Sequence, residues 1–195
     1  MGTKDKILAA ALDLFNNQGA RAVTTNHIAA EVGISPGNLY YHFKNREEIV
    51  RTLYQRMAEE CNECQDPGNS HDKPSFEGLE EHFQKITNIE WKYRFIKRDI
   101  ARLIDRDPEL KQLFQEVHQQ KQVEIAESIQ GFVSAGLTRD MDDRAREQMA
   151  QIIWLISTFW QPFLELSNKK VTRESLAEGM DLVRFLIKPF IKDET

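Results

Sequence analysis

The sequence is poor in cysteine and has no long apolar run. Its 195 residues include two cysteines, Cys61 and Cys64, which are too few for the disulfide framework of a small secreted domain. No stretch approaches the roughly 18 apolar residues of a membrane-spanning helix. Charged residues interrupt the N-terminal MGTKDKILAAALDLF, where a signal peptide would need an apolar core. We therefore expect a cytoplasmic protein that does not enter a membrane.

The two cysteines form a C-x-x-C pair, CNEC, which admits more than one interpretation. Such a pair can be a redox couple or half of a zinc site. The nearest further ligand candidate is His71, and no second pair of cysteines or histidines follows. We predict ordinary thiols at the end of a helix, with no metal site and no cofactor.

The sequence also lacks an excess of positive charge. It has 26 Lys and Arg against 31 Asp and Glu, a formal net charge of -5 and a pI near 5.6. An acidic protein is a poor nucleic-acid binder if its charge is spread evenly. Residues 1–56, however, hold seven basic and five acidic residues, a net charge of +2, and the remaining residues carry -7. A polyanionic partner is therefore predicted for the N-terminal part only.

The alternation of apolar and polar residues that marks strands is almost absent. Apolar residues instead recur at helical spacing through nearly the whole chain, which predicts an all-α fold. The first helix carries Ile7 and Phe15 on one face and ends at Gly19, a residue type that suits a helix C-cap. Two short helices then begin after the N-cap residues Thr24 and Ser35.

A fourth helix is expected to begin at the potential N-cap Asn45 and to reach about Cys64. The clearest loop is QDPGNSHDKPS, residues 65–75, which contains two prolines and a glycine. Beyond it, long helices are expected over residues 75–104, 109–135, 142–167 and 172–192. The predicted architecture is a three-helix N-terminal domain, a linking helix and a larger helical body.

Residues 24–43, TTNHIAAEVGISPGNLYYHF, have the layout of a helix-turn-helix. The two short helices meet at Gly33, where a residue without Cβ turns most easily. Ile28 and Leu39 have the spacing to pack against the first helix. In this motif the second helix enters the DNA major groove by its N-terminal end. The pattern alone also fits corners between two helices that bind no DNA.

The front of the second helix carries residue types that suit DNA. Small residues at 35–38 allow close approach, and exposed N–H groups there attract phosphate. Asn38 can bond a base edge, and the two tyrosines and the histidine that follow can donate to phosphate oxygens. We expect one of the two tyrosines to face partly inward and Phe43 to be buried.

Residues 7–50 closely resemble the N-terminal domain of the TetR family of bacterial transcriptional regulators. The resemblance rests on three coupled motifs, A-x-x-L-F-x-x-x-G, T-x-x-x-I-A-x-x-x-G-I-S and L-Y-Y-H-F-K-N-R-E-E. It implies a helix-turn-helix DNA-binding domain over residues 1–46 and a helical domain for effector binding and dimerisation over residues 47–195. The DNA contacts predicted from the residues and the resemblance together are Thr24, Thr25, Asn26, Ser35, Pro36, Gly37, Asn38, Tyr40, Tyr41, His42, Lys44 and Arg46.

Members of that family are homodimers that use their last two helices for dimerisation, and two apolar faces near the C-terminus fit this role. The alternative is that both faces are packed inside one chain. We favour the dimer. The predicted interface contains Ile156, Trp160, Phe163, Met180, Val183 and Ile187.

The resemblance also implies an effector pocket in the helical body. The candidate lining residues are Phe83, Trp91, Phe95, Phe114, His118, Phe132, Trp154 and Phe159. Aromatic residues at helical spacing are usually part of a core, so each of them has a structural alternative. We expect a small, largely apolar effector, and the sequence does not identify it.

Taken together, these features predict a TetR-like repressor that binds a palindromic DNA operator as a homodimer and responds to a ligand. A second hypothesis is a TetR-like interaction protein whose body binds a protein partner. An enzyme is not predicted, because the sequence has no nucleophile elbow, phosphate-binding loop or H-E-x-x-H motif.

Overall fold

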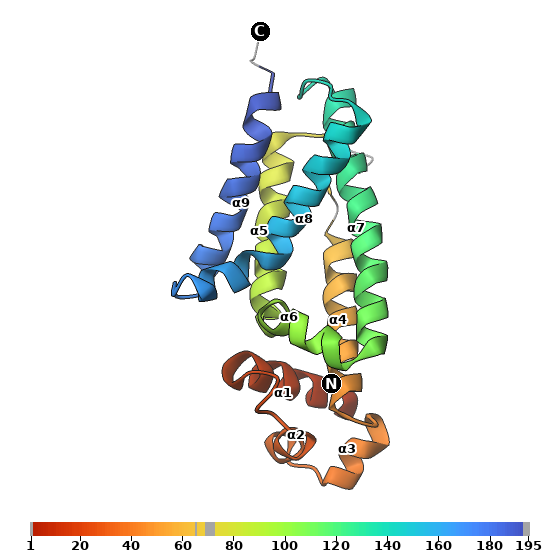
Figure 1. Ribbon diagram of the computed structural model, residues 1–195. Coiled ribbons are helices and arrows are strands. Elements are labelled where there is room, and N and C mark those ends of the chain that lie inside the picture. Colours follow the sequence, from red (N-terminus) through yellow and green to blue (C-terminus); the bar gives the residue numbers. More distant parts are fainter. Residues whose placement is uncertain (1, 65, 69–72, 193–195) are drawn as a thin grey trace. The chain divides into compact units, whose positions relative to one another are not determined.

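A computed structural model describes residues 2–64, 66–68 and 73–192 of the protein. In these residues the chain forms helices and no β-strand, which confirms the all-α prediction (Figure 1). No helix in this part of the chain has the length and apolar character needed to cross a membrane. The elements are α1 (Thr3–Gln18), α2 (Thr25–Val32), α3 (Pro36–His42), α4 (Arg46–Glu63), α5 (Phe76–Lys92), α6 (Arg94–Arg106), α7 (Pro108–Ser134), α8 (Asp143–Leu166), α9 (Arg173–Ile187) and the short 3-10 helix η1 (Lys188–Phe190).

The chain divides into two compact units that are not consecutive in sequence. The head comprises Met1–Glu60 and Tyr93–Phe114, and the body comprises Cys61–Lys92 and Gln115–Thr195. The head therefore includes α6. The domain boundary expected from the sequence, after residue 46, places this helix in the second domain. The head holds 13 Lys and Arg against 11 Asp and Glu, whereas the body holds 13 against 20. The acidity of the chain thus resides in the body.

Side-chain caps fix the two short helices of the head. The Thr24 hydroxyl accepts a hydrogen bond from the His27 backbone N–H, and His27 Nδ1 accepts one from the Thr24 N–H, which closes a capping box at the start of α2. Gly33 ends α2 in the left-handed conformation, with a φ of 73°. Ser35 then caps α3 by accepting from the Asn38 N–H at 3.2 Å. The predicted N-caps Thr24 and Ser35 are confirmed.

The head has its own apolar core, formed where α1 packs against α2 and α6 and where α2 packs against α3. Phe95 of α6 lies in it, with its ring centroid 5.0 Å from that of Phe15. Each such side chain contributes about 1.5–3 kcal/mol on burial, so the core fixes the orientation of α3. The buried side chains include Ile7, Leu8, Phe15, Val23, Ile28, Leu39 and Phe43.

The single helix predicted over residues 75–104 is wrong, because the chain breaks at Tyr93 into α5 and α6. Tyr93 has φ and ψ of -107° and 26°, and its buried side chain donates a hydrogen bond to the Glu60 carboxylate at 2.7 Å. The Asn16 side chain, from α1, accepts from the Phe95 N–H at 3.1 Å and so caps the first turn of α6. Contacts between distant residues, rather than the local sequence, therefore end α5.

Arg98 also joins α6 to α1, with the donor now on α6 and the acceptors on α1. Its guanidinium extends from α6 to the last turn of α1, where it donates to the carbonyls of Phe15 at 2.7 Å and Asn16 at 3.2 Å. The Phe15 carbonyl also accepts from the Gly19 N–H at 3.0 Å, and α1 has no basic residue of its own in its last turn, so the Arg98 charge complements the carbonyl end of the helix. Asn16 and Arg98 thus form a reciprocal cap between α1 and α6.

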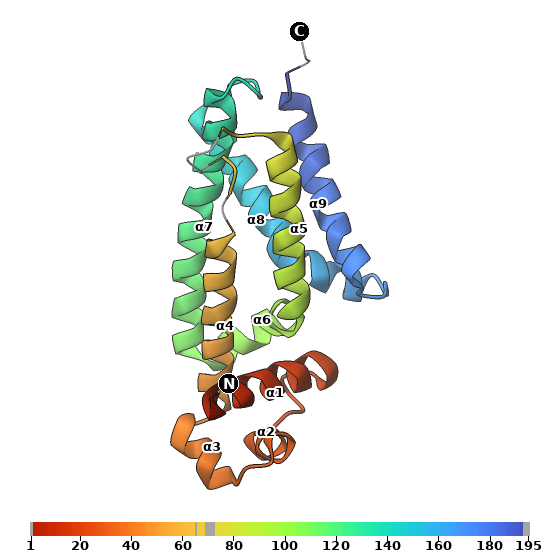
Figure 2. The same cartoon turned by 180° about the vertical axis from the view of Figure 1, so that it is seen from behind.

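In the body, α9 packs against both α5 and α8, and all three lie close together in opposite views (Figures 1 and 2). Met180 and Val183 of α9 are 4% and 1% exposed and form a core with Phe83. Ile156 and Ile187 pack against this core. Met180 and Val183 therefore lie in the core of one chain with no surface to offer a partner, whereas Ile156 and Ile187 are only partly buried.

Trp160, a fifth residue of that predicted interface, also makes contacts within the chain. Its indole lies against Gly179, and the indole N–H donates to the Ser175 carbonyl at 2.8 Å. Phe163, the sixth, is 51% exposed. It belongs to an exposed apolar row along α8 and α9, which consists of Ile152, Leu155, Phe159, Phe163, Leu166, Leu182 and Phe185.

Candidate nucleic-acid interface and a groove in the body

The residues predicted to contact DNA lie at the start of α2, along α3 and at the start of α4 (Figure 1). Those exposed to solvent are Thr24, Asn26, Ser35, Pro36, Gly37, Asn38, Tyr40, Tyr41 and Lys44. Thr25, His42 and Arg46 are partly buried. The buried apolar core on the other side of α3 holds this polar set toward solvent.

A hydrogen bond joins the start of α2 to α3. The hydroxyl oxygens of Thr25 and Tyr40 are 3.0 Å apart, and either group can be the donor. Each hydroxyl has a single proton, so the hydroxyl that accepts in this pair keeps its own proton for an outside acceptor. The pair therefore offers one oriented O–H donor at the surface, which suits a phosphate oxygen.

The adjacent tyrosines differ in exposure: Tyr40 is half covered, at 50% exposed, which fits the expectation that one of them faces partly inward, and Tyr41 is 86% exposed. Leu39 and Phe43, four positions apart, fill the inward face at this end of α3, and both are buried. The two tyrosines fall on the outer side between them. The Tyr41 ring meets the edge of the His42 ring at a centroid distance of 5.2 Å.

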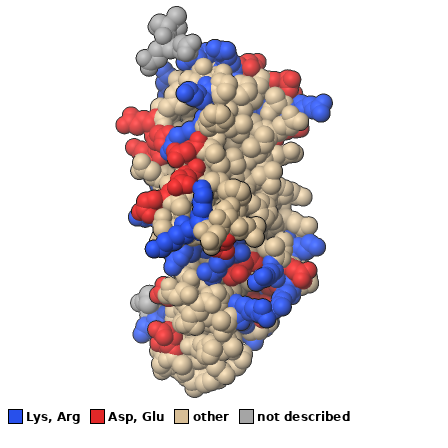
Figure 3. Space-filling view, turned by 60° about the vertical axis from the view of Figure 1, so that its left-hand side comes forward, with Lys and Arg blue, Asp and Glu red and all other residues tan. Residues whose placement is uncertain are grey.

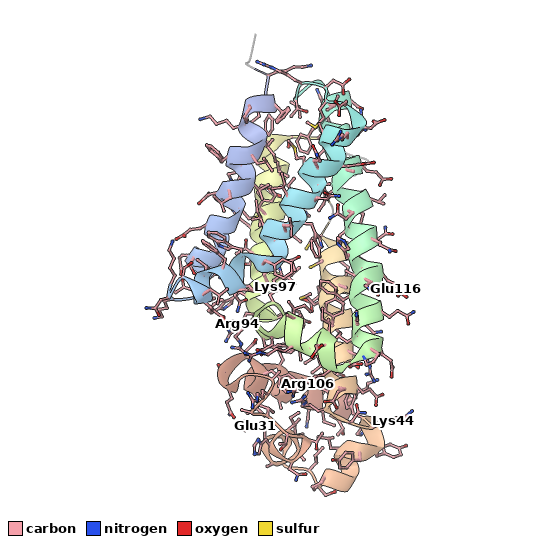
Figure 4. The ribbon with its side chains drawn as sticks, viewed as in Figure 1. Glu31, Lys44, Arg94, Lys97, Arg106 and Glu116 are labelled. Atoms are coloured by element: carbon pink, nitrogen blue, oxygen red, sulfur yellow. The ribbon has the colours of Figure 1, made fainter. Side chains whose placement is uncertain are left out.

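The two basic residues after α3 differ in how far the rest of the head holds their side chains. Arg46 donates from Nη1 to the Ala20 carbonyl at 2.7 Å and pairs through Nη2 with Glu47 at 3.0 Å. It therefore ties the segment after α1 to the start of α4. Lys44 is exposed, and its side chain points away from the head (Figure 4). Lys44 is thus the freer cation for a phosphate.

On the face that Figure 3 shows, the lowest part of the head, formed by α2 and α3, is mostly uncharged surface. Basic residues gather instead on α6, which carries Arg94, Lys97, Arg98, Arg102 and Arg106 (Figure 4). Burial lowers the pKa of Arg94, and the neighbouring charge of Arg98 lowers it further. The exposed side of α3 thus presents neutral hydrogen-bond donors such as Tyr40, with Lys44 following the helix.

The body contains an open groove of about 750 Å³ between α7 and α8. Its walls include His118, Gln122 and Ala126 of α7 and Arg146, Trp154 and Leu155 of α8. The rings of His118 and Trp154 are in contact, with centroids 4.1 Å apart. A volume of this size is in the range of pockets that bind small molecules.

His118 and Trp154 are the two predicted effector residues that line this groove. Sequence analysis missed most of its polar wall, including Arg146 and Gln151. A possible signal was the row 118, 122, 126 and 130 at one-turn spacing on α7, but its mixed polarity resembles an ordinary solvated helix face. The other six predicted residues do not line it: Phe95 and Phe114 belong to the head, Phe83 and Phe132 are buried in the body, and Trp91 and Phe159 are partly or largely exposed.

The head has the fold of a helix-turn-helix DNA-binding domain, with a polar second helix exposed. Two family profiles match the chain: "Bacterial regulatory proteins, tetR family" over residues 7–53 and "Bacterial transcriptional repressor" over residues 54–195. The chain therefore belongs to the TetR family of bacterial DNA-binding transcriptional repressors.

Three known proteins illustrate the relationship. A TetR-family transcriptional regulator from Marinobacter aquaeolei VT8 is 33% identical, has a TM-score of 0.89, and is matched over 98% of this chain and 92% of that one. The regulator QacR of Staphylococcus aureus is 49% identical over 49 residues, which span 25% of this chain and only 26% of QacR. SmeT in complex with triclosan is 16% identical with a TM-score of 0.72 over 99% of this chain and 93% of SmeT, which shows a shared fold.

Proposed function

We propose that this protein is a ligand-responsive repressor that binds a palindromic operator as a homodimer in the bacterial cytoplasm. The main observation in support is the exposed face of α3. It presents Asn38 beside the Thr25–Tyr40 hydroxyl pair on a helix fixed by a buried core. The DNA major groove admits an α-helix, and the residues at its N-terminal end face the base edges.

In this proposal the polar residues of the head divide into two roles. Asn38 reads a base edge, since an amide can bond adenine in a bidentate manner. Tyr40, His42 and Lys44 bind phosphate oxygens, which fixes the register of α3 without reading sequence. The remaining contacts come from Thr24, Thr25, Asn26, Ser35, Pro36, Gly37 and Tyr41, with Arg46 acting mainly by holding the start of α4.

The exposed apolar row of α8 and α9 supports the homodimer. Phe185 is 78% and Phe163 51% exposed, and they belong to a row of seven large apolar side chains. A contiguous apolar surface of this kind marks an interaction site. A two-fold axis would bring the same row of a second chain onto it, so that one sequence feature supplies both sides of the interface.

The groove between α7 and α8 supports the ligand response. The family fold accommodates a small molecule in SmeT, as its complex with triclosan shows. A ligand alters DNA affinity only if it binds one conformation of the repressor better than another. The helices α4 and α7 each contribute residues to both head and body, so a change in the body has a continuous route to the head.

The test is to map where the purified protein binds across bacterial genomic DNA, with the Asn38→Ala variant as the matched control. The Asn38 side chain makes no capping bond, since Ser35 accepts from its backbone N–H, so the variant keeps α3 intact. We expect sites with two inverted half-sites about one helical turn (~10 base pairs) apart. The variant should lose preference at one position of each half-site.

Binding to sites without an inverted repeat would contradict the homodimer on a palindrome. Failure to bind any duplex, together with a stable complex with one cellular protein, would instead favour the hypothesis of a TetR-like interaction protein.

A further inference from the structure

The groove between α7 and α8 is long enough for an extended molecule. His118 and Gln130 line it on α7, and their 12-residue separation corresponds to about 18 Å at the rise of an α-helix. On α8 the lining runs from Arg146 to Leu155. Because α8 returns along α7, Trp154 meets His118 at one end, and Arg146 lies toward the Gln130 end.

The two ends differ in chemistry. At one end the rings of His118 and Trp154 are in contact, and Val123, Ala126 and Leu155 extend an apolar surface from them. The other end holds Arg146 beside glutamine and glutamate side chains. The groove is therefore amphipathic along its length.

Two buried polar atoms in the groove walls have no hydrogen-bond partner among the described residues: Arg146 Nε and His118 Nδ1. The rest of the Arg146 guanidinium is fixed, since Nη2 donates to the Met141 carbonyl at 3.2 Å and Nη1 pairs with Asp143 at 3.2 Å. Its Nε–H is a donor held in place, and only an acceptor can satisfy it. A buried donor without an acceptor destabilises the site that holds it, so an occupant that supplies an acceptor is favoured.

The charges of the groove select against an anionic acceptor. Glu127 and Glu147 line the groove and are exposed, and Asp143 already pairs with Arg146. A carboxylate ligand would meet these three negative charges, whereas an ammonium would offer no acceptor to Arg146 Nε. An uncharged oxygen satisfies the donor without either penalty.

We propose that this groove binds an elongated, uncharged molecule with an apolar body and an oxygen acceptor at one end. The oxygen accepts from Arg146 Nε, and the apolar body lies over Trp154 and Ala126. A role of this groove in regulation rests on the proposed ligand response. Binding of the molecule itself can be measured without DNA.

Calorimetric titration of the full-length protein with three probes of one shape tests the ligand class. The probes are 4-butylbenzamide, 4-butylbenzoate and 4-butylbenzylamine, which are neutral, anionic and cationic at pH 7. We expect the amide to bind at least about tenfold more tightly than either charged probe. The benzoate meets unfavourable negative charge in the groove, and the amine cannot accept the hydrogen bond from Arg146 Nε. Tighter binding of the benzoate or the amine, or no binding of any probe, would overturn the proposal.

Variants of the chain test the location. Arg146→Lys keeps the charge and removes the Nε donor, and we expect it to weaken amide binding about tenfold. Arg144→Lys is the matched control, because Arg144 is exposed on the same first turn of α8 and does not line the groove. Ala126→Trp fills the groove with a large side chain and should abolish binding. Equal affinities for Arg146→Lys and Arg144→Lys would overturn the assignment.

The groove inference and the proposed ligand response can fail independently of each other. If the amide binds through Arg146 but leaves operator affinity unchanged, the groove inference stands and the ligand response through it fails. If another compound releases operator while Ala126→Trp has no effect on that release, the ligand response stands and the groove inference fails. A thiol-labelling experiment on Gln151→Cys gives a further test. If the cysteine is protected at concentrations at which the protein dimerises, a second chain covers the groove, and the groove inference is overturned.

Discussion

Replacing Arg98 with methionine is predicted to loosen the end of α1 while leaving the body unchanged. The guanidinium donates to two carbonyls in the last turn of α1, at 2.7 and 3.2 Å. Hydrogen bonds to charged groups contribute about 1.5–3 kcal/mol each, and a cation at a helix C-terminus adds about 0.3–1 kcal/mol. The Arg98 side chain is 24% exposed, and methionine keeps much of its packed length. After a discount for solvent screening we expect a net loss of about 2 kcal/mol.

The chain offers separate probes for head and body. Its three tryptophans, Trp91, Trp154 and Trp160, all lie in the body, so their fluorescence during urea unfolding reports on the body alone. Amide hydrogen exchange in the last turn of α1 reports on the head. A loss of about 2 kcal/mol corresponds to exchange roughly 30-fold faster there, with no change in the tryptophan transition.

Arg102→Met is the matched control, because Arg102 lies about one turn further along α6 and is exposed. Its effect should be within about 0.5 kcal/mol. Equal exchange rates in α1 for the two variants would refute the reasoning, since the reciprocal cap would then contribute nothing. A matching fall in the tryptophan transition of Arg98→Met would also contradict it, by showing that head and body unfold together.

Four further substitutions test the interface assignments. Phe185→Glu should give a folded monomer in sedimentation, with weakened operator binding. Val183→Asp buries a charge in the body core and should unfold the body at a cost of several kcal/mol. A dimeric Phe185→Glu would exclude the apolar row as the interface. Tyr40→Phe removes one phosphate donor and should weaken binding to operator and random duplex alike by about 1 kcal/mol in filter-binding assays; a loss limited to one base position would show that Tyr40 reads sequence. Lys44→Ala should lower the slope of log affinity against log salt by up to about 2 in a dimer, one phosphate contact per head; an unchanged slope would remove Lys44 from the contact set.

The starts of the short helices could be predicted from the sequence because their caps are local. Thr24 and Ser35 each accept a hydrogen bond from the residue three positions later, so a few consecutive residues specify the start. The break at Tyr93 could not be predicted in this way. The groups that stabilise it, on Asn16 and Glu60, are distant in sequence and become neighbours only in the folded head.

The inward side of the last two helices was also beyond sequence reasoning. Val183 and Phe185 are two positions apart on α9 and therefore lie on different sides of it. Both are large and apolar, yet one is buried against Phe83 and the other is exposed. Helical periodicity locates such residues on a helix, but the position of α5 decides which side is covered. Most of the groove's lining was missed for a related reason, since seven of its eleven residues are polar and resemble a solvated helix face.

The acidic composition is compatible with DNA binding because the charge is divided between the two units. Residues 1–60 hold seven basic and seven acidic side chains, so the net charge of +2 on the head comes from residues 93–114. Among the described residues, the exposed end of α2 and α3 carries hydroxyls and amides, the carboxylate of Glu31 and the exposed Lys44 after α3. In the proposed function, oriented donors such as the Thr25–Tyr40 pair contribute to affinity there, and their geometry depends on the buried core beneath α3. The reciprocal cap between α1 and α6 stabilises the helix against which that core is built, so its loss should weaken operator binding even though neither Asn16 nor Arg98 belongs to the predicted contact set.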